Sequence, residues 1–282
     1  MQDFFVKVNG IDVHYVKKGS GPPVLLIHGL GEFFESWMFN IDGLSSEFTV
    51  YAMDLPGHGL SEEWTDEYNI ESGTRFLYGF MEAVGIDKAV IVGHSLGGPM
   101  TVGLAVRHPE KVEKLVLVNS GGFDDHVSMG YRLATVPVLG RIMLGPRQIF
   151  NRKTIRFGMR RQFFNAGAVP EAWVEAACTH FRRPNRNSML MKIIRSYTGL
   201  RGIKKDVTIL NLLPEIHQPV LIVHGENDNV VPVEKVREAC RLIDSAAVTI
   251  FNECGHNPHI EKSSEFNEAV ASFLRNGHTG HD

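Results

Sequence analysis

Residues 93–98, Gly-His-Ser-Leu-Gly-Gly, place a single serine between glycines at the end of an apolar run. The run at 89–92 predicts a buried strand, and residues 99–106 after the glycines predict a helix. A strand that turns directly into a helix at this pattern forces the serine, Ser95, into a strained backbone conformation. Side chains in place of the flanking glycines would obstruct the turn. The segment therefore predicts a serine hydroxyl that is exposed at the edge of a sheet.

Further apolar runs predict the other strands of a mostly parallel sheet. Runs without polar alternation are typical of strands that helices cover on both faces. Such runs lie at 23–28, 49–53, 89–92, 114–118 and 220–223, with an edge strand at 248–251. Helical stretches alternate with them at 70–84, 99–107, 233–242 and 264–274. Near the N-terminus, runs at 4–8 and 11–16 flank the dipeptide Asn9-Gly10, which predicts a tight antiparallel hairpin.

The alternation of strands and helices breaks between residues 122 and 205. No buried strand is predicted there, and helix-compatible segments are separated by prolines and glycines. We interpret residues 122–205 as an insertion into a core that is formed by residues 1–121 and 206–276. The polar residues 277–282 predict a flexible tail.

The serine motif in its strand-turn-helix setting, together with partner residues further along the chain, resembles the α/β-hydrolase family from about Phe5 to Leu274. The resemblance implies an α/β fold in which helices flank a mostly parallel eight-stranded sheet, and it implies a helical lid at the insertion. Residues 54–61, Asp-Leu-Pro-Gly-His-Gly-Leu-Ser, are a hallmark of the same family. We interpret them as a rigid turn in which Asp54 and His58 satisfy buried loop groups.

A serine hydroxyl needs a base to remove its proton, and histidine is the usual base because its pKa lies near neutrality. Of the thirteen histidines we prefer His256, which lies in a loop just after the last predicted strand, at the same edge as Ser95. In the family that the chain resembles, the catalytic histidine occupies this loop in a Gly-His pattern followed five residues later by an acid, and Glu261 fits. His94 adjoins Ser95, but adjacent residues at a tight turn point in different directions. We therefore assign His94 a packing role.

A carboxylate must hold the imidazole of His256 in the correct tautomer. Asp228 follows a predicted strand, and the resulting order Ser, Asp, His is the order that these hydrolases use. The alternative for Asp228 is a cap on the helix that begins near Val233. Asp124 and Asp125 are reserve candidates, because some relatives place the acid after the strand that follows the serine.

Two main-chain N–H groups are candidates for the oxyanion hole, which stabilises the negative charge that forms during acyl transfer. One is that of Leu96, immediately after the nucleophile. The other is that of Leu30, which follows His28-Gly29 at a place where the family has a His-Gly-x motif. Because the donors belong to the main chain, the two leucine side chains are expected to shape the pocket.

The composition is that of an ordinary globular protein, with 43% hydrophobic and 22% charged residues. A net charge of −3 gives no indication of nucleic-acid binding. The N-terminus lacks a basic region followed by a long apolar core, and no apolar run reaches the roughly 18 residues of a membrane span. We therefore expect a cytoplasmic protein.

No cofactor or metal ion is expected from the sequence. The three cysteines, Cys178, Cys240 and Cys254, have no CxxC spacing, so neither a disulfide framework nor a thiolate site is predicted. No cluster of histidines and acids has the spacing of metal ligands. A third glycine that a dinucleotide-binding loop would need is replaced by Phe34.

The predicted lid is strongly basic. Residues 122–205 contain sixteen Lys and Arg against four Asp and Glu, whereas the whole chain carries a net charge of −3. Basic residues interleave with apolar ones, as Arg156 does with Ile155 and Phe157, in a pattern compatible with an amphipathic surface helix. One hypothesis is that the lid contacts anionic membranes transiently. The simpler explanation, which we prefer at this stage, is that a basic lid and an acidic core attract each other.

We expect a serine hydrolase that acts on small-molecule carboxylic esters. Ser95 would be acylated, and His256 would then activate water to release the acid. Apolar lid residues would suit an acyl chain, and the candidates for substrate binding are Met129, Leu133, Leu139 and Met143. The sequence carries no signal of an oligomeric state.

Two alternatives stay open. A carbon–carbon bond hydrolase of the meta-cleavage type resembles the chain along its whole length. Those relatives place a tryptophan after the catalytic histidine and an asparagine before the serine, where this chain has Asn257 and His94. Their substrate-binding lid arginine has three candidates, Arg182, Arg183 and Arg186. The other alternative is a non-catalytic receptor for a small ligand, because some receptors on this fold retain the triad.

Overall fold

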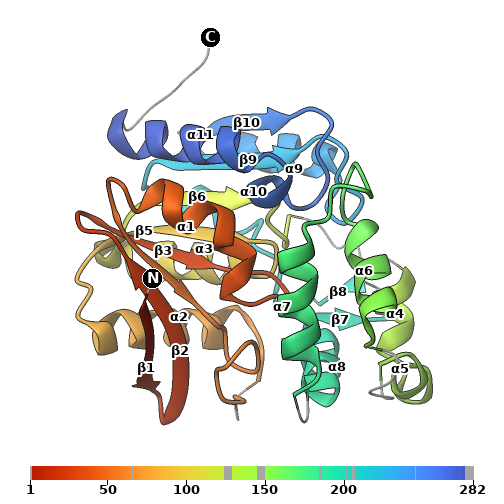
Figure 1. Cartoon of the computed structure of the whole chain (residues 1–282). Coiled ribbons are helices and arrows are strands. Elements are labelled where there is room, and N and C mark those ends of the chain that lie inside the picture. The colour runs from red at the N-terminus through yellow and green to blue at the C-terminus, as the bar shows by residue number, and fades with distance from the viewer. Residues whose placement is uncertain are drawn as a thin grey trace.

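The computed structural model describes residues 2–64, 67–123, 129–144, 150–183, 186–200, 202–204, 207–244 and 246–276. An eight-stranded sheet forms the centre of the molecule, with helices on both faces and a further group of helices beside it (Figure 1). The strands are β1 (Gln2–Val8), β2 (Ile11–Lys18), β3 (Pro23–Ile27), β4 (Thr49–Met53), β5 (Ala89–His94), β6 (Val112–Val118), β9 (Val220–Gly225) and β10 (Ala246–Phe251). The α/β class and the eight-stranded sheet are thus confirmed.

The strands follow the order β1-β2-β4-β3-β5-β6-β9-β10 across the sheet. β1 pairs antiparallel with β2, β2 pairs antiparallel with β4, and every pairing from β4 to β10 is parallel. The hairpin between β1 and β2 turns at Asn9 and Gly10, whose φ angles of 49° and 90° are the left-handed values that this dipeptide tolerates. The carboxyl ends of the parallel strands meet at one edge of the sheet, which is where ligands bind in folds of this kind.

The helices of the core are η1 (Phe34–Trp37), α1 (Met38–Leu44), α2 (Ile70–Val84), α3 (Gly97–Arg107), η2 (Pro109–Lys111), η5 (Leu213–Glu215), α9 (Val233–Ala239), η6 (Cys240–Leu242), α10 (Pro258–Glu261) and α11 (Ser263–Asn276), where η marks a 3₁₀ helix. The four helical stretches that the sequence predicts correspond to α2, α3, α9 with η6, and α11, and they begin and end within a few residues of the expected positions. Within the ranges given above, no helix is both long and apolar enough to cross a membrane.

The helical segment formed by η1 and α1 was not predicted. Its buried apolar residues Phe34, Trp37, Ile41 and Leu44 recur at helical spacing, so the signal was present in the sequence. They belong to the hydrophobic core on the face of the sheet that α11 also covers. This segment lies between β3 and β4. Its burial in the core fixes the end of the preceding loop, which carries Leu30.

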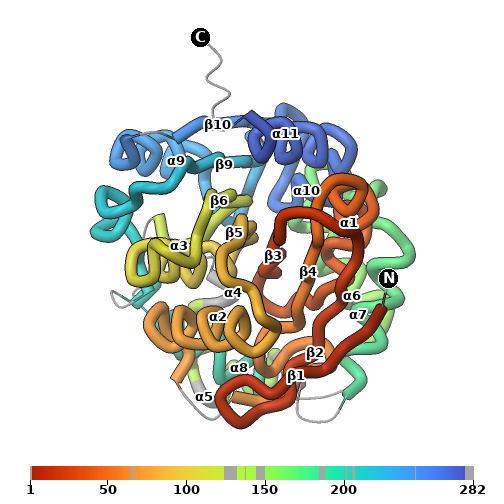
Figure 2. Tube along the Cα trace, turned by 90° about the vertical axis from the view of Figure 1, so that its left-hand side faces the viewer, coloured from red at the N-terminus to blue at the C-terminus, as the bar shows by residue number. Residues whose placement is uncertain are grey.

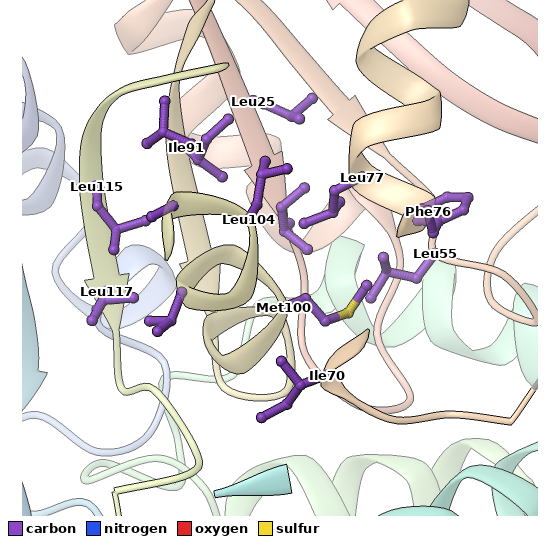
Figure 3. Close-up of a cluster of buried hydrophobic side chains, with 14 of the residues drawn as sticks. Leu25, Leu55, Ile70, Phe76, Leu77, Ile91, Met100, Leu104, Leu115 and Leu117 are labelled. Atoms are coloured by element: carbon purple, nitrogen blue, oxygen red, sulfur yellow. The ribbon is translucent and has the colours of Figure 1, made fainter. Parts of the chain in front are cut away.

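Successive residues of the central strands point into two separate cores, because side chains alternate between the faces of a sheet. On one face, Leu25, Ile91 and Leu117 pack with Leu77 of α2 and Leu104 of α3 (Figure 3). On the other face, the neighbouring valines and leucines pack against α1 and α11. Figure 2 shows α2 and α3 on one side of the sheet and α1 and α11 on the other. Burial on both faces explains why these strands read as continuous apolar runs.

The insertion lies between β6 and β9 and forms a group of helices on one side of the sheet (Figure 1). It contains α4 (Met129–Ala134), α5 (Pro137–Leu144), α6 (Arg152–Arg160), α7 (Glu171–Phe181), α8 (Arg186–Tyr197), β7 (Thr198–Gly199) and β8 (Gly202–Ile203). A helical insertion was predicted, whereas the short β7-β8 hairpin was not. The boundaries 1–121, 122–205 and 206–276 stay a prediction, and residues 277–282 lie outside the described residues.

Replacing Ile91 by alanine should destabilise the fold strongly. Ile91 is fully buried in β5, and truncating a buried isoleucine leaves a cavity that typically costs about 2–5 kcal/mol of unfolding free energy. The matched control is Val248→Ala on the edge strand β10, where the side chain is 41% exposed and a cost of about 0.5 kcal/mol is expected. Urea unfolding of both variants measures the difference, and equal midpoints would contradict the assignment of β5 to the centre of the core.

Candidate active site

Ser95 lies in the turn between β5, which ends at His94, and α3, which begins at Gly97. Its φ angle is 48°, a left-handed conformation that is strained for a residue with a side chain. The main chain holds this conformation, because the Ser95 N–H donates to the Val118 carbonyl at 3.0 Å and the Ser95 carbonyl accepts from the Gly98 N–H at 3.1 Å. The turn predicted from the serine motif is present, with the serine half-buried at the end of β5.

Two glycines of the motif have no room for a side chain. A Cβ atom at Gly93 would lie 2.7 Å from Thr101 Cγ2, and a Cβ atom at Gly97 would lie 2.7 Å from the carbonyl oxygen of Ile27. Both distances are shorter than non-bonded carbon atoms normally reach. The close approach of α3 to β3 and β5 therefore requires glycine on either side of the serine.

His256 lies in the loop between β10 and α10, as predicted. Its Nε2 atom is 3.0 Å from Ser95 Oγ, within the distance at which the hydroxyl donates to a neutral imidazole. The side chain of Glu261 accepts from the N–H groups of Gly255 at 3.0 Å and of Asn257 at 3.3 Å, on either side of the histidine. The acid noted five residues after the Gly-His pattern thus holds the main chain of the histidine loop.

Asp228 follows β9 and binds the far side of the histidine, with Asp228 Oδ2 at 2.8 Å from His256 Nδ1. The other carboxylate oxygen accepts from the N–H groups of Val230 at 2.7 Å and Val231 at 3.1 Å. The alternative role as a helix cap does not apply, because Pro232 is the N-cap of α9 and no side chain caps that helix. The structure therefore brings Ser95, His256 and Asp228 together in the order of hydrogen bonds that a catalytic triad requires.

The charges of this pair stabilise each other. Burial alone would raise the pKa of Asp228, but the positive charge of a protonated His256 and the hydrogen bonds from His256 and Asn119 outweigh it and hold that pKa well below its usual range. Burial alone would lower the pKa of His256, but the charge and hydrogen bond of Asp228 outweigh it and raise that pKa. The arrangement favours an imidazolium opposite a carboxylate, which is the state that forms when the serine is deprotonated.

Two polar residues beside Asp228, of which Asn119 binds its carboxylate, were missed in the sequence. Asn119 donates from Nδ2 to Asp228 Oδ2 at 2.6 Å, and it has a φ angle of 40° at the end of β6. His224 Nε2 lies 3.6 Å from the same oxygen, and burial lowers the pKa of His224 to about 4, so the ring is neutral. A polar residue directly after a buried strand was the available signal for Asn119. Nothing in the local sequence distinguishes His224.

Leu30 and Leu96, whose main-chain N–H groups are the candidate oxyanion donors, both line the pocket beside Ser95. Neither group donates to a main-chain or side-chain acceptor of the described residues. The loop of Leu30 is held in place by its neighbour Gly31, whose N–H donates to His58 Nε2 at 3.1 Å. Both groups therefore lack another acceptor among the described residues, and their role as oxyanion donors stays a prediction.

A pocket of about 130 Å³ opens beside Ser95 and His256. Its apolar lining consists of Leu30, Leu96, Pro99, Tyr197, Ile203, Val207, Val230 and Val231. The polar side chains of Glu32, Gln162 and Thr198 complete the lining. Among the described residues that line it there is one carboxylate and no lysine or arginine. The pocket is therefore suited to a mostly apolar group next to the scissile bond.

The role of Leu133, Leu139 and Met143 in substrate binding stays a prediction, and the structure does not place them in the lining of the pocket. None of the three lines the pocket, and their side chains are 38%, 40% and 37% exposed. The reason is that α4 and α5 pack on each other and on α8, which leaves these side chains at the surface. The lid reaches the pocket instead through the β7-β8 hairpin and the end of α8. For the fourth candidate, Met129, the side chain lies outside the described residues.

Other candidates do not reach the pocket or lie outside the described residues. Arg183 donates from Nη1 to the Gly59 carbonyl at 3.2 Å, and Arg182 is exposed. The side chain of Arg186, like the reserve acids Asp124 and Asp125, lies outside the described residues.

His94 has more than the packing role expected for it. It is fully buried, with Nδ1 at 3.1 Å from Glu32 Oε2 and Nε2 at 3.0 Å from the carbonyl oxygen of His256. His94 therefore connects the main chain of the catalytic histidine with the loop after β3.

Asp54 behaves as the structural interpretation requires. Its carboxylate accepts from His14 Nδ1 and from the N–H groups of Phe34 and Leu60, each at 2.8 Å. All these partners belong to the core, and the carboxylate does not line the pocket.

Comparisons with known proteins agree with this geometry. The sequence profile of the α/β hydrolase fold family matches residues 22–263, so the chain belongs to that family, and it is a serine hydrolase. It is 31% identical over 278 residues to the 2-hydroxy-6-oxo-6-(2'-aminophenyl)hexa-2,4-dienoic acid hydrolase of Metapseudomonas resinovorans, covering 96% of this chain and 90% of the relative. The acetyltransferase component of the acetoin cleaving system of Cupriavidus necator is 31% identical over 271 residues, which cover 96% of this chain and 68% of the relative. The solved structure of a meta-cleavage product hydrolase from Pseudomonas fluorescens superposes with a TM-score of 0.83 at 26% identity, covering 98% of each chain.

Replacing Asp228 by asparagine should lower turnover by roughly 10⁴-fold, because an amide can bind the wrong tautomer of His256. The acid limb of the kcat profile should also move to lower pH, since the charge of Asp228 raises the pKa of His256. A rate series over pH measures both effects. Asp244→Asn, after η6, is the control that should leave rate and profile unchanged, and an unaltered profile in Asp228→Asn would contradict the assignment.

Proposed function

We propose that this serine hydrolase cleaves a carbon–carbon bond next to a carbonyl group, in the manner of the meta-cleavage product hydrolases. The proposal is carried by its likeness to such hydrolases over nearly the whole chain, 96% against one relative and 98% against a solved structure. The placement of Ser95 Oγ 3.0 Å from His256 Nε2 supports the chemistry.

The reaction would proceed through an acyl-enzyme. Ser95 Oγ attacks the carbonyl carbon while its proton passes to His256 Nε2, and the N–H groups of Leu30 and Leu96 stabilise the oxyanion. Collapse of this intermediate breaks the carbon–carbon bond, and the leaving carbon takes the proton back from His256. Water, deprotonated by His256, then attacks the acyl group, and the proton returns to Ser95. One water is consumed, and one carboxylic acid is released.

The nature of the leaving group distinguishes carbon–carbon bond cleavage from the hydrolysis of a carboxylic ester. A carbon leaving group departs with an electron pair, which must be delocalised into a conjugated system, as in a vinylogous diketone. An alcohol leaving group needs no such delocalisation. The same Ser95, His256 and Asp228 would serve both reactions, so the triad alone does not separate them.

Hydrolysis of a carboxylic ester is the second candidate, and the lining of the pocket favours it. The named relative acts on a dienoic acid, whose carboxylate calls for a cationic partner. No lysine or arginine occurs among the described lining residues, and Glu32 would repel such a carboxylate. An uncharged ester suits this lining better.

A comparison of two substrates tests the proposal. The kcat/KM of the full chain is measured on a 2-hydroxy-6-oxo-hexa-2,4-dienoate with an aryl or alkyl group and on p-nitrophenyl esters of increasing acyl length. We expect the dienoate to be cleaved with the higher kcat/KM. A kcat/KM that is higher for an ester, with the dienoate left intact, would overturn the first candidate in favour of the second.

Ser95→Ala should abolish turnover of either substrate, with a loss of at least roughly 10⁴-fold, and should abolish labelling by a fluorophosphonate. The matched control is Ser46→Ala, which changes an exposed serine and should keep both turnover and fluorophosphonate labelling. Folded wild-type protein that turns over neither substrate class would contradict an enzymatic role and favour the receptor hypothesis.

We also propose that the lid contacts anionic membrane surfaces. Val138 and Ile142 of α5 are 67% and 62% exposed, which is unusual for two large apolar side chains on one helix. Arg141, between them in sequence, is exposed as well. The basic residues of α6 are only partly neutralised, since Arg152 and Arg156 pair with Glu171 inside the lid.

Co-sedimentation with vesicles tests this contact. The full chain should bind vesicles that contain an anionic phospholipid at low salt, and should be released by salt of about 0.5 M, which screens the attraction. The variant Val138→Asp/Ile142→Asp should bind roughly tenfold more weakly. The control Leu242→Asp/Val248→Asp changes exposed residues near the β10 edge of the sheet and should bind normally. Equal sedimentation with neutral and anionic vesicles would contradict the proposal.

A further inference from the structure

Three buried side chains with metal-binding atoms meet behind the catalytic histidine. Glu32 follows β3, His94 ends β5, and His259 belongs to α10, so the three are distant in sequence. One nitrogen of each histidine and one carboxylate oxygen all lie within 4.8 Å of one another. Among the described residues this is the only such group. Two histidines and one carboxylate are a common ligand set for divalent transition metals.

His259 is the member that most needs a partner. The ring is fully buried, and neither of its nitrogens has a donor or acceptor within hydrogen-bond distance among the described residues. Its neighbours are aromatic: the ring centroid lies 4.5 Å from those of Trp37 and His94 and 6.2 Å from that of Phe266. A buried polar group without a partner is a common mark of a bound ion or water.

His94 and Glu32 have the surroundings of metal ligands. The Nε2 atom of His94 lies 3.0 Å from the carbonyl oxygen of His256, and it donates to that oxygen. A metal-binding histidine usually makes such a bond through the nitrogen that does not bind the metal, since the bond fixes its tautomer. The Nδ1 atom points to Glu32 Oε2 at 3.1 Å, and a cation would replace the proton that lies between these two atoms. The carboxylate of Glu32 is held by the Gly29 N–H, which donates at 2.9 Å to Oε2, the oxygen that also faces His94.

We propose that Glu32, His94 and His259 bind one divalent transition-metal ion of the zinc type. Zinc binds histidine nitrogen and carboxylate oxygen at about 2.0–2.2 Å, which places neighbouring ligand atoms about 3.4 Å apart. The distance from His94 Nδ1 to Glu32 Oε2 is 3.1 Å, close to that spacing. A small movement of the His259 ring toward His94 Nδ1 and Glu32 Oε2 would bring its nitrogen to the same spacing and complete the three protein ligands. The ion reaches the site from the pocket, whose wall includes Glu32.

The ion would be structural, because the three ligands belong to three segments that build the active site. Glu32 lies in the loop of the oxyanion donor Leu30, and His94 precedes the nucleophile. His259 is the second residue of α10, the helix that follows the catalytic histidine. A shared cation therefore connects the oxyanion loop, the nucleophile turn and the histidine loop. It takes no part in bond breaking.

Metal content tests the site directly. The untagged full chain is dialysed against Zn²⁺ and then against buffer, and zinc is measured by plasma mass spectrometry. We expect about one Zn²⁺ per chain. At a hundredfold excess over Kd, Zn²⁺ should raise the Tm by roughly 4 °C. His259→Phe, which fills the aromatic surroundings, should lose both effects. The control His108→Asn removes a half-exposed histidine that pairs with Glu110, and it should keep both.

A spectroscopic measurement keeps the test decisive if His259→Phe does not fold. Co²⁺ bound to wild-type protein in place of Zn²⁺ should give the intense visible bands of a four- or five-coordinate ion, and Glu32→Gln should weaken them. The proposal is overturned if dialysed wild-type protein holds no more zinc than His259→Phe. It is also overturned if Co²⁺ shows only the weak spectrum of the hydrated ion. None of these readouts depends on the substrate or on enzymatic activity.

Discussion

The strained turn at Ser95 is the constraint on which the rest of the site depends. A left-handed φ at a serine costs of the order of 1–3 kcal/mol, and it persists only where the surroundings leave no other path. Here the Ser95 N–H is bound to Val118 in β6, and Gly97 packs against Ile27 in β3. Three buried strands therefore hold one turn. The geometry of the nucleophile therefore depends on the packing of the sheet.

Around this turn, the active site is stabilised by polar groups that satisfy one another. The carboxylate of Asp228 is buried, which is tolerable only because His256, Asn119 and two main-chain N–H groups bind it. The imidazole of His256 is buried as well, and its charge when protonated is compensated by that carboxylate. The main chain of the same histidine is held by Glu261 on one side and by His94 on the other. Reactivity thus depends on a small polar network inside an apolar core.

Much of the site could be predicted because its members have local signatures. Ser95 and His256 each follow a strand within a short glycine-containing pattern. Because parallel strands run in the same direction, the residues that follow them lie at the same edge of the sheet. Asn119 and Glu32 lack such patterns, and their roles depend on partners that are distant in the chain. The position of the lid residue Leu133 outside the pocket lining was not predictable, since an apolar residue on a short helix can face a pocket, a core or solvent with the same spacing.

The sequence by itself determined most of the alternation of strands and helices, the nucleophile turn and the place of a helical insertion, through local backbone geometry and the periodicity of apolar residues. It did not predict η1, α1 or the β7-β8 hairpin, and it selected Asp228 and His256 with the help of the family resemblance. Only the tertiary structure decided which side chains line the pocket, and that Glu32, His94 and His259 meet. Such contacts join residues more than 60 positions apart, and they depend on how the strands and helices pack, which no local pattern encodes.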